Sequence, residues 1–125
     1  MNSASFDSAP RLPEILDLQA SADSLVIQAR VPADLLYLRG HFNCAPVVAG
    51  IVQLQWAQHY ARRQFNLSGG IQRMEQVKFQ RLLRPPESFT LSLDWQRAKS
   101  SVAFRIYYGE RRYSSGRMLF GPPAR

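Results

Sequence analysis

The 125-residue chain has a single cysteine, Cys44, and no run near the roughly 18 consecutive apolar residues that a membrane-spanning helix needs. One thiol cannot form an internal disulfide, and no second cysteine is present to build a metal site with it. Neither a metal-ligand spacing nor a glycine-rich phosphate loop occurs. The first residues also lack the basic and apolar regions of a secretory signal. We therefore expect a cytoplasmic protein with no membrane span, no metal and no cofactor of its own.

Acidic residues are scarce relative to basic ones. Sixteen basic residues oppose nine acidic ones, which leaves a net charge of +7 at pH 7. Fourteen of the sixteen are arginine, whose forked guanidinium binds phosphates and carboxylates. An anionic partner is therefore expected. The arginines are dispersed and no nucleic-acid module accompanies them, which argues against nucleic acid. An acidic carrier protein with a phosphopantetheine arm fits this charge, and a solvated basic surface without a ligand is the alternative.

The chain divides into an arm and one domain. Residues 1–13 are small, polar and proline-bearing, which predicts a flexible N-terminal arm. Residues 14–125 are expected to form a single domain, because 46% of the chain is hydrophobic and its length suits one core.

A helix is predicted from Gly50 to about Phe65, where apolar residues recur at spacings of three and four. The predicted buried stripe consists of Ile51, Leu54, Ala57, Ala61 and Phe65. The other side presents Gln55, His59 and Arg62 at successive turns. Ser68-Gly69-Gly70 is expected to end the helix. We interpret Trp56 and Tyr60, which lie near the stripe, as core or dimer packing.

Period-two alternation predicts strands on both sides of this helix. The expected strands are about 24–31, 74–82, 91–95, 102–108 and 112–119, with a hairpin turn at Gly109-Glu110. One strand, one helix and then four antiparallel strands indicate an α+β domain whose sheet wraps around one long central helix. A small sheet of this kind leaves an edge strand open, so we expect a dimer.

The segment before the helix carries the chemistry. His41 lies in a Gly-His-Phe loop, and a histidine titrates near neutral pH and can act as a general base. A helix that begins at Gly50 presents unpaired backbone N–H groups to a carbonyl oxygen. Together these features are typical of a site that handles an acyl thioester.

The motif Gly40-His41-Phe42, followed by Pro46-Val47 and the helix at Gly50, resembles the signature of hotdog-fold 3-hydroxyacyl-(acyl carrier protein) dehydratases. Val77-Lys78-Phe79 with Arg81, Pro85 and Glu87 is similar to the strand and turn that follow the helix in that family. The Val52–Trp56 stretch looks closest to the ApeI-like dehydratases associated with aryl polyene pathways. The resemblance covers most of the chain and implies the hotdog fold, as a homodimer or a heterodimer with a related subunit.

The resemblance also implies a reaction. Water would be eliminated from a 3-hydroxyacyl thioester carried on phosphopantetheine, in fatty acid or aryl polyene type biosynthesis. His41 would take a proton from C2, and the Gly50 N–H would hold the thioester oxygen. The family places an acidic side chain five residues after the helix glycine, supplied across the dimer interface. Here that position is Gln55, which can donate a hydrogen bond but cannot deliver a proton.

Several residues have two interpretations. His59 lies one turn after Gln55 and either replaces the missing acid or is a surface or interface histidine. The arginines either steer the carrier or form a solvated face; they include Arg62, Arg63, Arg81 and Arg84. Cys44 is interpreted as a small apolar residue and not as a nucleophile.

The resemblance, taken together with these residues, implies three candidate functions. The first is a 3-hydroxyacyl dehydratase acting on acyl carrier protein or CoA thioesters, with His41 and Gln55 in the site and Gly50 as the oxyanion donor. The second is a non-catalytic acyl-carrier-binding subunit that pairs with an active paralogue. The third is a thioesterase, because the same oxyanion donor could activate a carbonyl for attack by water.

Overall fold

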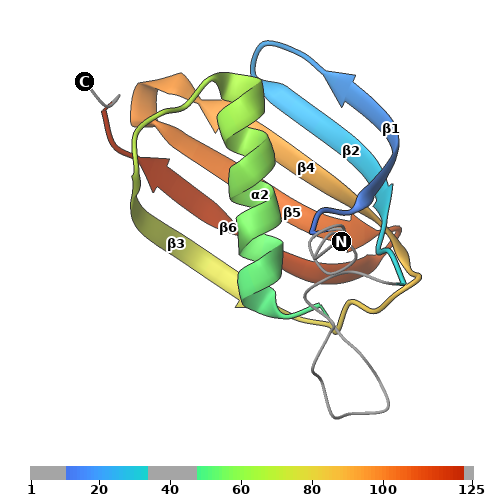
Figure 1. Cartoon of the computed structure of the whole chain (residues 1–125). Coiled ribbons are helices and arrows are strands. Elements are labelled where there is room, and N and C mark those ends of the chain that lie inside the picture. The colour runs from blue at the N-terminus through green and yellow to red at the C-terminus, as the bar shows by residue number, and fades with distance from the viewer. Residues whose placement is uncertain (1–10, 34–47, 123–125) are drawn as a thin grey trace, which may run out of the picture.

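The computed structural model describes residues 11–33 and 48–122. They form one six-stranded antiparallel sheet with a long helix, α2 (Gly50–Phe65), across one of its faces (Figure 1). The strands are β1 (Glu14–Ala20), β2 (Ser24–Arg30), β3 (Ile71–Phe79), β4 (Ser88–Gln96), β5 (Ser101–Tyr108) and β6 (Arg111–Phe120). A short 3-10 turn, η2 (Arg97–Lys99), joins β4 to β5. The expected α+β class is confirmed.

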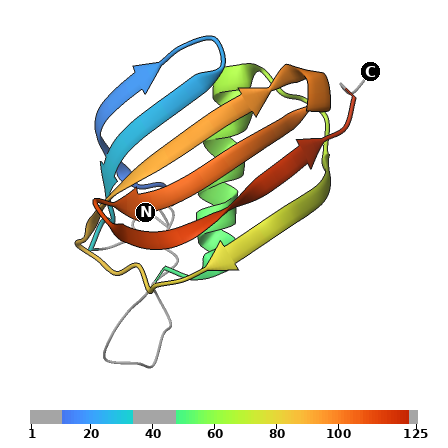
Figure 2. The same ribbon diagram turned by 180° about the vertical axis from the view of Figure 1, so that it is seen from behind.

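The strands follow the order β1-β2-β4-β5-β6-β3, so β1 and β3 are the two edges. Viewed from the back, the sheet lies in front of α2, and no described helix covers its outer face (Figure 2). Leu25, Leu93, Phe104 and Gly116 lie side by side on the four central strands, facing α2. A Cβ at Gly116 would lie 2.9 Å from the Phe104 ring, so the glycine makes room for that ring under the helix.

The buried face of α2 is rotated from the predicted stripe. Its buried residues are Val52, Gln53, Trp56, Ala57, Tyr60 and Ala61. Ile51, expected in the stripe, is 62% exposed, and that part of the prediction is wrong. The sheet curls around the helix and determines which side is covered, and this curvature is not visible in the local spacing. Trp56 and Tyr60 belong to the core, as interpreted, and the Trp56 ring stacks on Phe89 at 5.6 Å.

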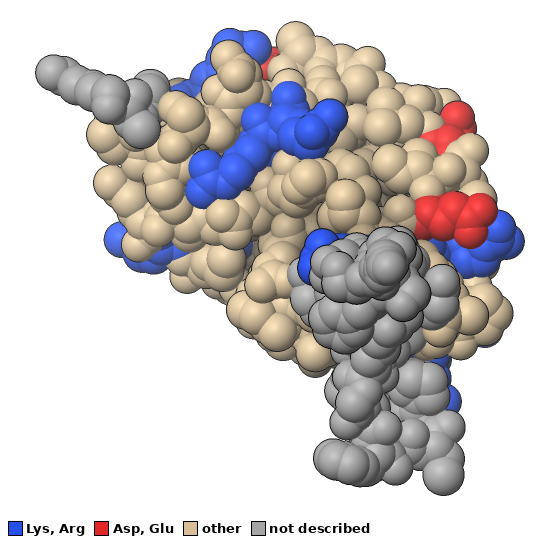
Figure 3. All heavy atoms as spheres, viewed as in Figure 1, with Lys and Arg blue, Asp and Glu red and all other residues tan. Residues whose placement is uncertain are grey.

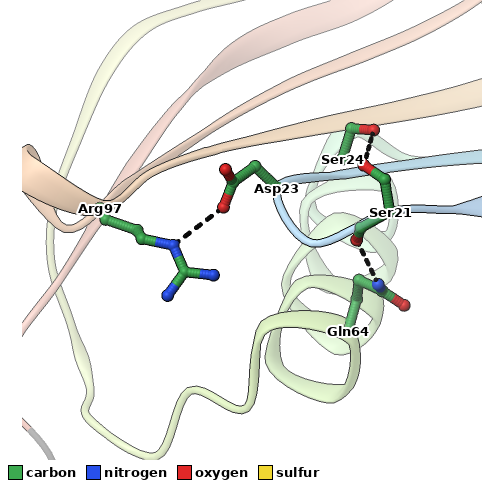
Figure 4. A network of polar contacts seen from close by, with 5 residues as sticks. All are labelled: Ser21, Asp23, Ser24, Gln64 and Arg97. Carbon is green, nitrogen blue, oxygen red and sulfur yellow. Dashed lines mark hydrogen bonds and ion pairs between the residues drawn. The ribbon is translucent and has the colours of Figure 1, made fainter.

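The far end of α2 is closed by Asn66 and not by the glycines. Asn66 takes a left-handed conformation with φ 56°, and the next N–H, that of Leu67, donates to the Arg62 carbonyl at 3.0 Å. Gln64 ties the same end to the β1–β2 turn by donating to the Ser21 carbonyl at 3.0 Å (Figure 4). Beside this contact, Asp23 in the turn pairs with Arg97 of η2 at 2.9 Å (Figure 4).

Strand β1 was not predicted from the sequence. All seven of its residues are exposed, and a register irregularity between Ile15 and Asp17 breaks the alternation that would identify a strand. Immediately before it, Pro13 is buried and the Arg11 carbonyl accepts a hydrogen bond from Trp56 Nε1 at 2.9 Å. Residues 11–13 of the predicted arm therefore pack against the helix, and residues 1–10 lie outside the described part.

Strand β3 begins and ends three residues earlier than expected, and the other predicted strands and the Gly109-Glu110 turn are confirmed to within a few residues. Within the described ranges, no helix is long and apolar enough to cross a membrane.

Candidate functional site

The start of α2 has backbone donors that no described residue engages. Val48 is held against the β3–β4 connection because its N–H donates to the Leu83 carbonyl at 2.7 Å. Ala49 is extended and supplies no side-chain cap, and the first turn has no acidic residue. The N–H groups of Val52 and Gln53 both donate to the Ala49 carbonyl, at 3.0 and 3.2 Å. Among the described residues, the N–H groups of Gly50 and Ile51 therefore have no partner.

Gly50 also carries a steric requirement. A Cβ built at this position would lie 2.7 Å from Cε1 and 2.8 Å from Cζ of Phe79 on β3. The Phe79 ring thus lies directly on the helix start, while 53% of its surface remains exposed. This contact gives a physical reason for glycine at the predicted oxyanion position, and it places an apolar wall beside the open N–H groups.

Gln53 is a buried polar residue in the first turn of α2 that the sequence analysis did not single out. Its side chain is only 3% exposed, and its Nε2 donates to the Val48 carbonyl at 3.1 Å. Its Oε1 has no partner among the described residues. A buried amide oxygen without a partner costs about 1–3 kcal/mol, and the amide nitrogen still connects the first turn of α2 to Val48, two residues before the helix. In the sequence, the only feature that could have drawn attention to Gln53 was its polar side chain between the apolar Val52 and Leu54.

Gln55 and His59 lie one turn apart on the side of α2 away from the sheet. Gln55 is exposed and His59 is half-buried, with its ring edge-on to Tyr60 at 4.9 Å. Burial, and then the charge of Arg63, lower the pKa of His59 below its ordinary value. The imidazole is therefore neutral at pH 7, which suits an acceptor better than a proton donor. Among the contacts of the described residues, no hydrogen bond joins His59 to Gln55.

His41 and Cys44 lie outside the described residues, so the predicted base is not placed. Of the predicted site residues, the structure positions Gly50, Gln55 and His59 on one helix. Gly50 stands at its start, and His59 lies more than two turns later. Within the described ranges, no group of three or more His, Cys, Asp and Glu residues could hold a metal ion.

The four predicted carrier-surface arginines separate to opposite ends of the molecule. Arg62 and Arg63 are in the last turn of α2, where basic side chains gather on the helix face (Figure 3). Arg62 is engaged internally, because its Nη1 donates to the Gly69 carbonyl at 2.7 Å and its guanidinium lies 5.2 Å from the Phe120 ring centroid. Arg81 and Arg84 lie in the β3–β4 connection near the helix start. The four residues do not form one surface.

An antiparallel sheet wrapped around one long central helix is the architecture of a hotdog-fold protein. The family model of the ApeI-like proteins, described as ApeI dehydratase, matches residues 17–117. The chain therefore belongs to the ApeI-like dehydratase family, and the hotdog fold implied by the sequence motif is confirmed.

Solved structures agree with this assignment. The chain is similar to a chain of the dehydratase heterocomplex ApeI:P from Xenorhabdus doucetiae, with 27% identity, a TM-score of 0.81, and coverage of 88% of this chain and 98% of that one. It is also similar to an uncharacterized protein from Erwinia carotovora subsp. atroseptica, with 29% identity, a TM-score of 0.74, and coverage of 89% and 97%. No curated protein sequence matches the chain.

Proposed function

We propose that this protein forms part of a dehydratase that removes water from a carrier-bound 3-hydroxyacyl thioester. The observation that supports this proposal best is the start of α2, where two backbone N–H groups are open among the described residues in a member of a dehydratase family. In the proposed reaction His41 removes a proton from C2. The electrons of that C–H bond form the C2=C3 double bond, and the 3-hydroxyl takes up a proton and leaves as water.

The Gly50 N–H is proposed to bind the thioester oxygen while negative charge develops on it. A donor that is already oriented costs no reorganisation during the reaction, and each such donor typically contributes a few kcal/mol. The helix dipole points its positive end at the same position. The half-exposed Phe79 ring beside Gly50 provides an apolar wall, which limits water around that oxygen.

Gln55 explains why we propose a heteromeric enzyme. Its amide can orient the leaving hydroxyl but cannot protonate it, so an acid must come from elsewhere. The similar chain from Xenorhabdus doucetiae belongs to a dehydratase heterocomplex. In this chain β3 is an edge strand, which leaves one row of its backbone groups available for pairing with another subunit. A related hotdog subunit is therefore the proposed source of the carboxylate, and a homodimer is the alternative.

The test compares the chain alone with the chain mixed with a related hotdog subunit. Both samples receive 3-hydroxyacyl substrates on a carrier protein and on CoA, and enoyl product and free thiol are measured. Enoyl product from the mixture alone supports the heteromer. Product from the chain alone supports a homodimer that dehydrates with Gln55, and thiol release instead of enoyl product supports a thioesterase.

Two substitutions test the residues. His41→Ala should abolish elimination, and an unchanged rate would remove His41 from the mechanism. Gln55→Glu should raise the rate of the chain alone, because it restores an acid at that position. The cytoplasmic location and the pathway, fatty acid or aryl polyene type, remain predictions.

A further inference from the structure

The β5–β6 turn and the β3–β4 connection meet at one end of the sheet (Figure 2). Two adjoining hollows lie at this end. The first hollow, of about 590 Å³, includes Lys78, Arg105 and Arg112 with Ser115 and Glu110 in its lining. The second hollow, of about 540 Å³, is lined by Gln80, Arg81, Leu82, Arg84, Glu87 and Arg111, and Gln80 is common to both. Six cationic and two acidic side chains line the pair, an excess of four positive charges.

The cations of the first hollow lack an acidic partner in the part of the chain that the structure describes. Within the described residues, no ion pair or side-chain hydrogen bond engages Lys78, Arg105 or Arg112. By contrast, the exposed Arg30 pairs with Glu14 and the exposed Arg97 pairs with Asp23. Unpaired cations that share one hollow repel one another, so an anionic partner would bind there favourably.

In the second hollow, the carboxylate of Glu87 is already committed. It accepts from the Arg84 N–H at 2.7 Å and from the Tyr113 hydroxyl at 3.4 Å, and it lies 3.8 Å from Arg111. It therefore neutralises part of the charge locally and leaves the Arg81 and Arg84 guanidinium groups without an acidic partner among the described residues.

The first hollow opens on the face of the sheet away from α2. Arg105 pairs across the sheet with Ser115, and Ser115 pairs with Lys78, so these side chains share one face. Phe104 and Ile106, on either side of Arg105, are buried toward the helix. The Arg105 guanidinium also lies 5.2 Å from the Tyr107 ring centroid, which holds it over the hollow.

The hollows are connected to the helix start through β3. Phe79 packs on Gly50, and its neighbours Lys78 and Gln80 line the first hollow. A partner bound over the hollows would therefore lie one strand residue away from the aromatic wall of the site.

We propose that the two hollows are the docking surface for an acidic carrier protein. The proposal rests on the proposed function. Of the four arginines predicted from the sequence to steer the carrier, this surface keeps Arg81 and Arg84 and omits Arg62 and Arg63. The surface is open, polar and cationic, and the forked guanidinium groups match the carboxylates of acidic side chains. Such surfaces act mainly by steering association, so binding should weaken strongly as the salt concentration rises.

The test uses the double variant Arg105→Gln/Arg112→Gln and the matched control Arg63→Gln/Lys99→Gln. Each removes two positive charges from exposed residues, but the control positions lie at the opposite end of the molecule, in the last turn of α2 and in η2. Binding of a holo acyl carrier protein is measured by fluorescence anisotropy at low and physiological salt. Turnover is measured in parallel with the 3-hydroxyacyl group on the carrier and on pantetheine, with the complete complex if the chain alone is inactive.

The hollow variant should bind the carrier about tenfold more weakly, whereas the control changes less than about twofold. Its KM should rise for the carrier substrate and stay constant for the pantetheine substrate. Equal losses in both variants, no loss in the hollow variant, or tighter binding of a short RNA than of the carrier would overturn the proposal. Carrier binding without any turnover would support the docking surface and contradict the proposed dehydratase function. Turnover of the pantetheine substrate without carrier binding would support the dehydratase function and contradict the docking surface.

Discussion

Because Gly50 lies against the Phe79 ring, we expect the effect of Gly50→Ala on stability to change sign when that ring is removed. In Gly50→Ala the new Cβ would lie 2.7 Å from the Phe79 ring, well inside ordinary van der Waals contact. Overpacking of this kind costs about 1–3 kcal/mol. Against it stands the helix preference of alanine over glycine, up to about 1 kcal/mol and less in a first turn. We therefore expect Gly50→Ala to lower the free energy of unfolding by about 1–2 kcal/mol.

Removing the ring should remove the penalty. In a Phe79→Ala background, Gly50→Ala should be neutral or slightly stabilising, which gives a coupling energy of about 1–3 kcal/mol between the two positions. The assay is urea unfolding of the four proteins at one protein concentration, because association changes apparent stability. Gly70→Ala is the control, since a Cβ there meets nothing within 4 Å.

An equal cost of Gly50→Ala with and without the Phe79 ring would contradict the expected coupling. An increase in the stability of the wild-type background by Gly50→Ala would contradict it as well. Either result would mean that glycine at this position is not required by the aromatic contact.

Three further predictions follow from the site and the end of α2. Gln53→Glu should destabilise the fold progressively as the pH rises above about 4.3, because a buried carboxylate would face the Val48 carbonyl. This loss of stability is measured by unfolding at several pH values, with Gln53→Met as the uncharged control. Arg62→Ala should cost about 1–2 kcal/mol in urea unfolding, whereas exposed Arg63→Ala should cost under about 0.5 kcal/mol; equal losses would contradict the assigned contacts. The pKa of His59 is lowered in the fold, so its neutral ring contributes fully to the free energy of unfolding above pH 6.5, and this contribution is lost as the pH falls through the folded pKa. In His59→Gln the free energy of unfolding should therefore change less with pH over this range. A curve parallel to that of the wild type would contradict the prediction.

The local pattern of the sequence determined much of the fold. The helix from Gly50 to Phe65 and five of the six strands were predictable because each has a periodicity that neighbouring residues alone produce. The family was predictable because the motif around Gly50 resembles its signature, and the role of Gly50 as oxyanion donor stays a prediction.

Tertiary structure decided which surfaces those elements present. The curved sheet buries Gln53 and leaves Ile51 exposed, although both lie in the same helical turn. Strand β1 exists because β2 offers it a pairing edge, and its own residues show no buried side. The contact of Phe79 with Gly50 joins residues 29 positions apart, and the basic hollows combine β3, β5, β6 and a connection. Such arrangements depend on long-range packing, which no local spacing of residues encodes.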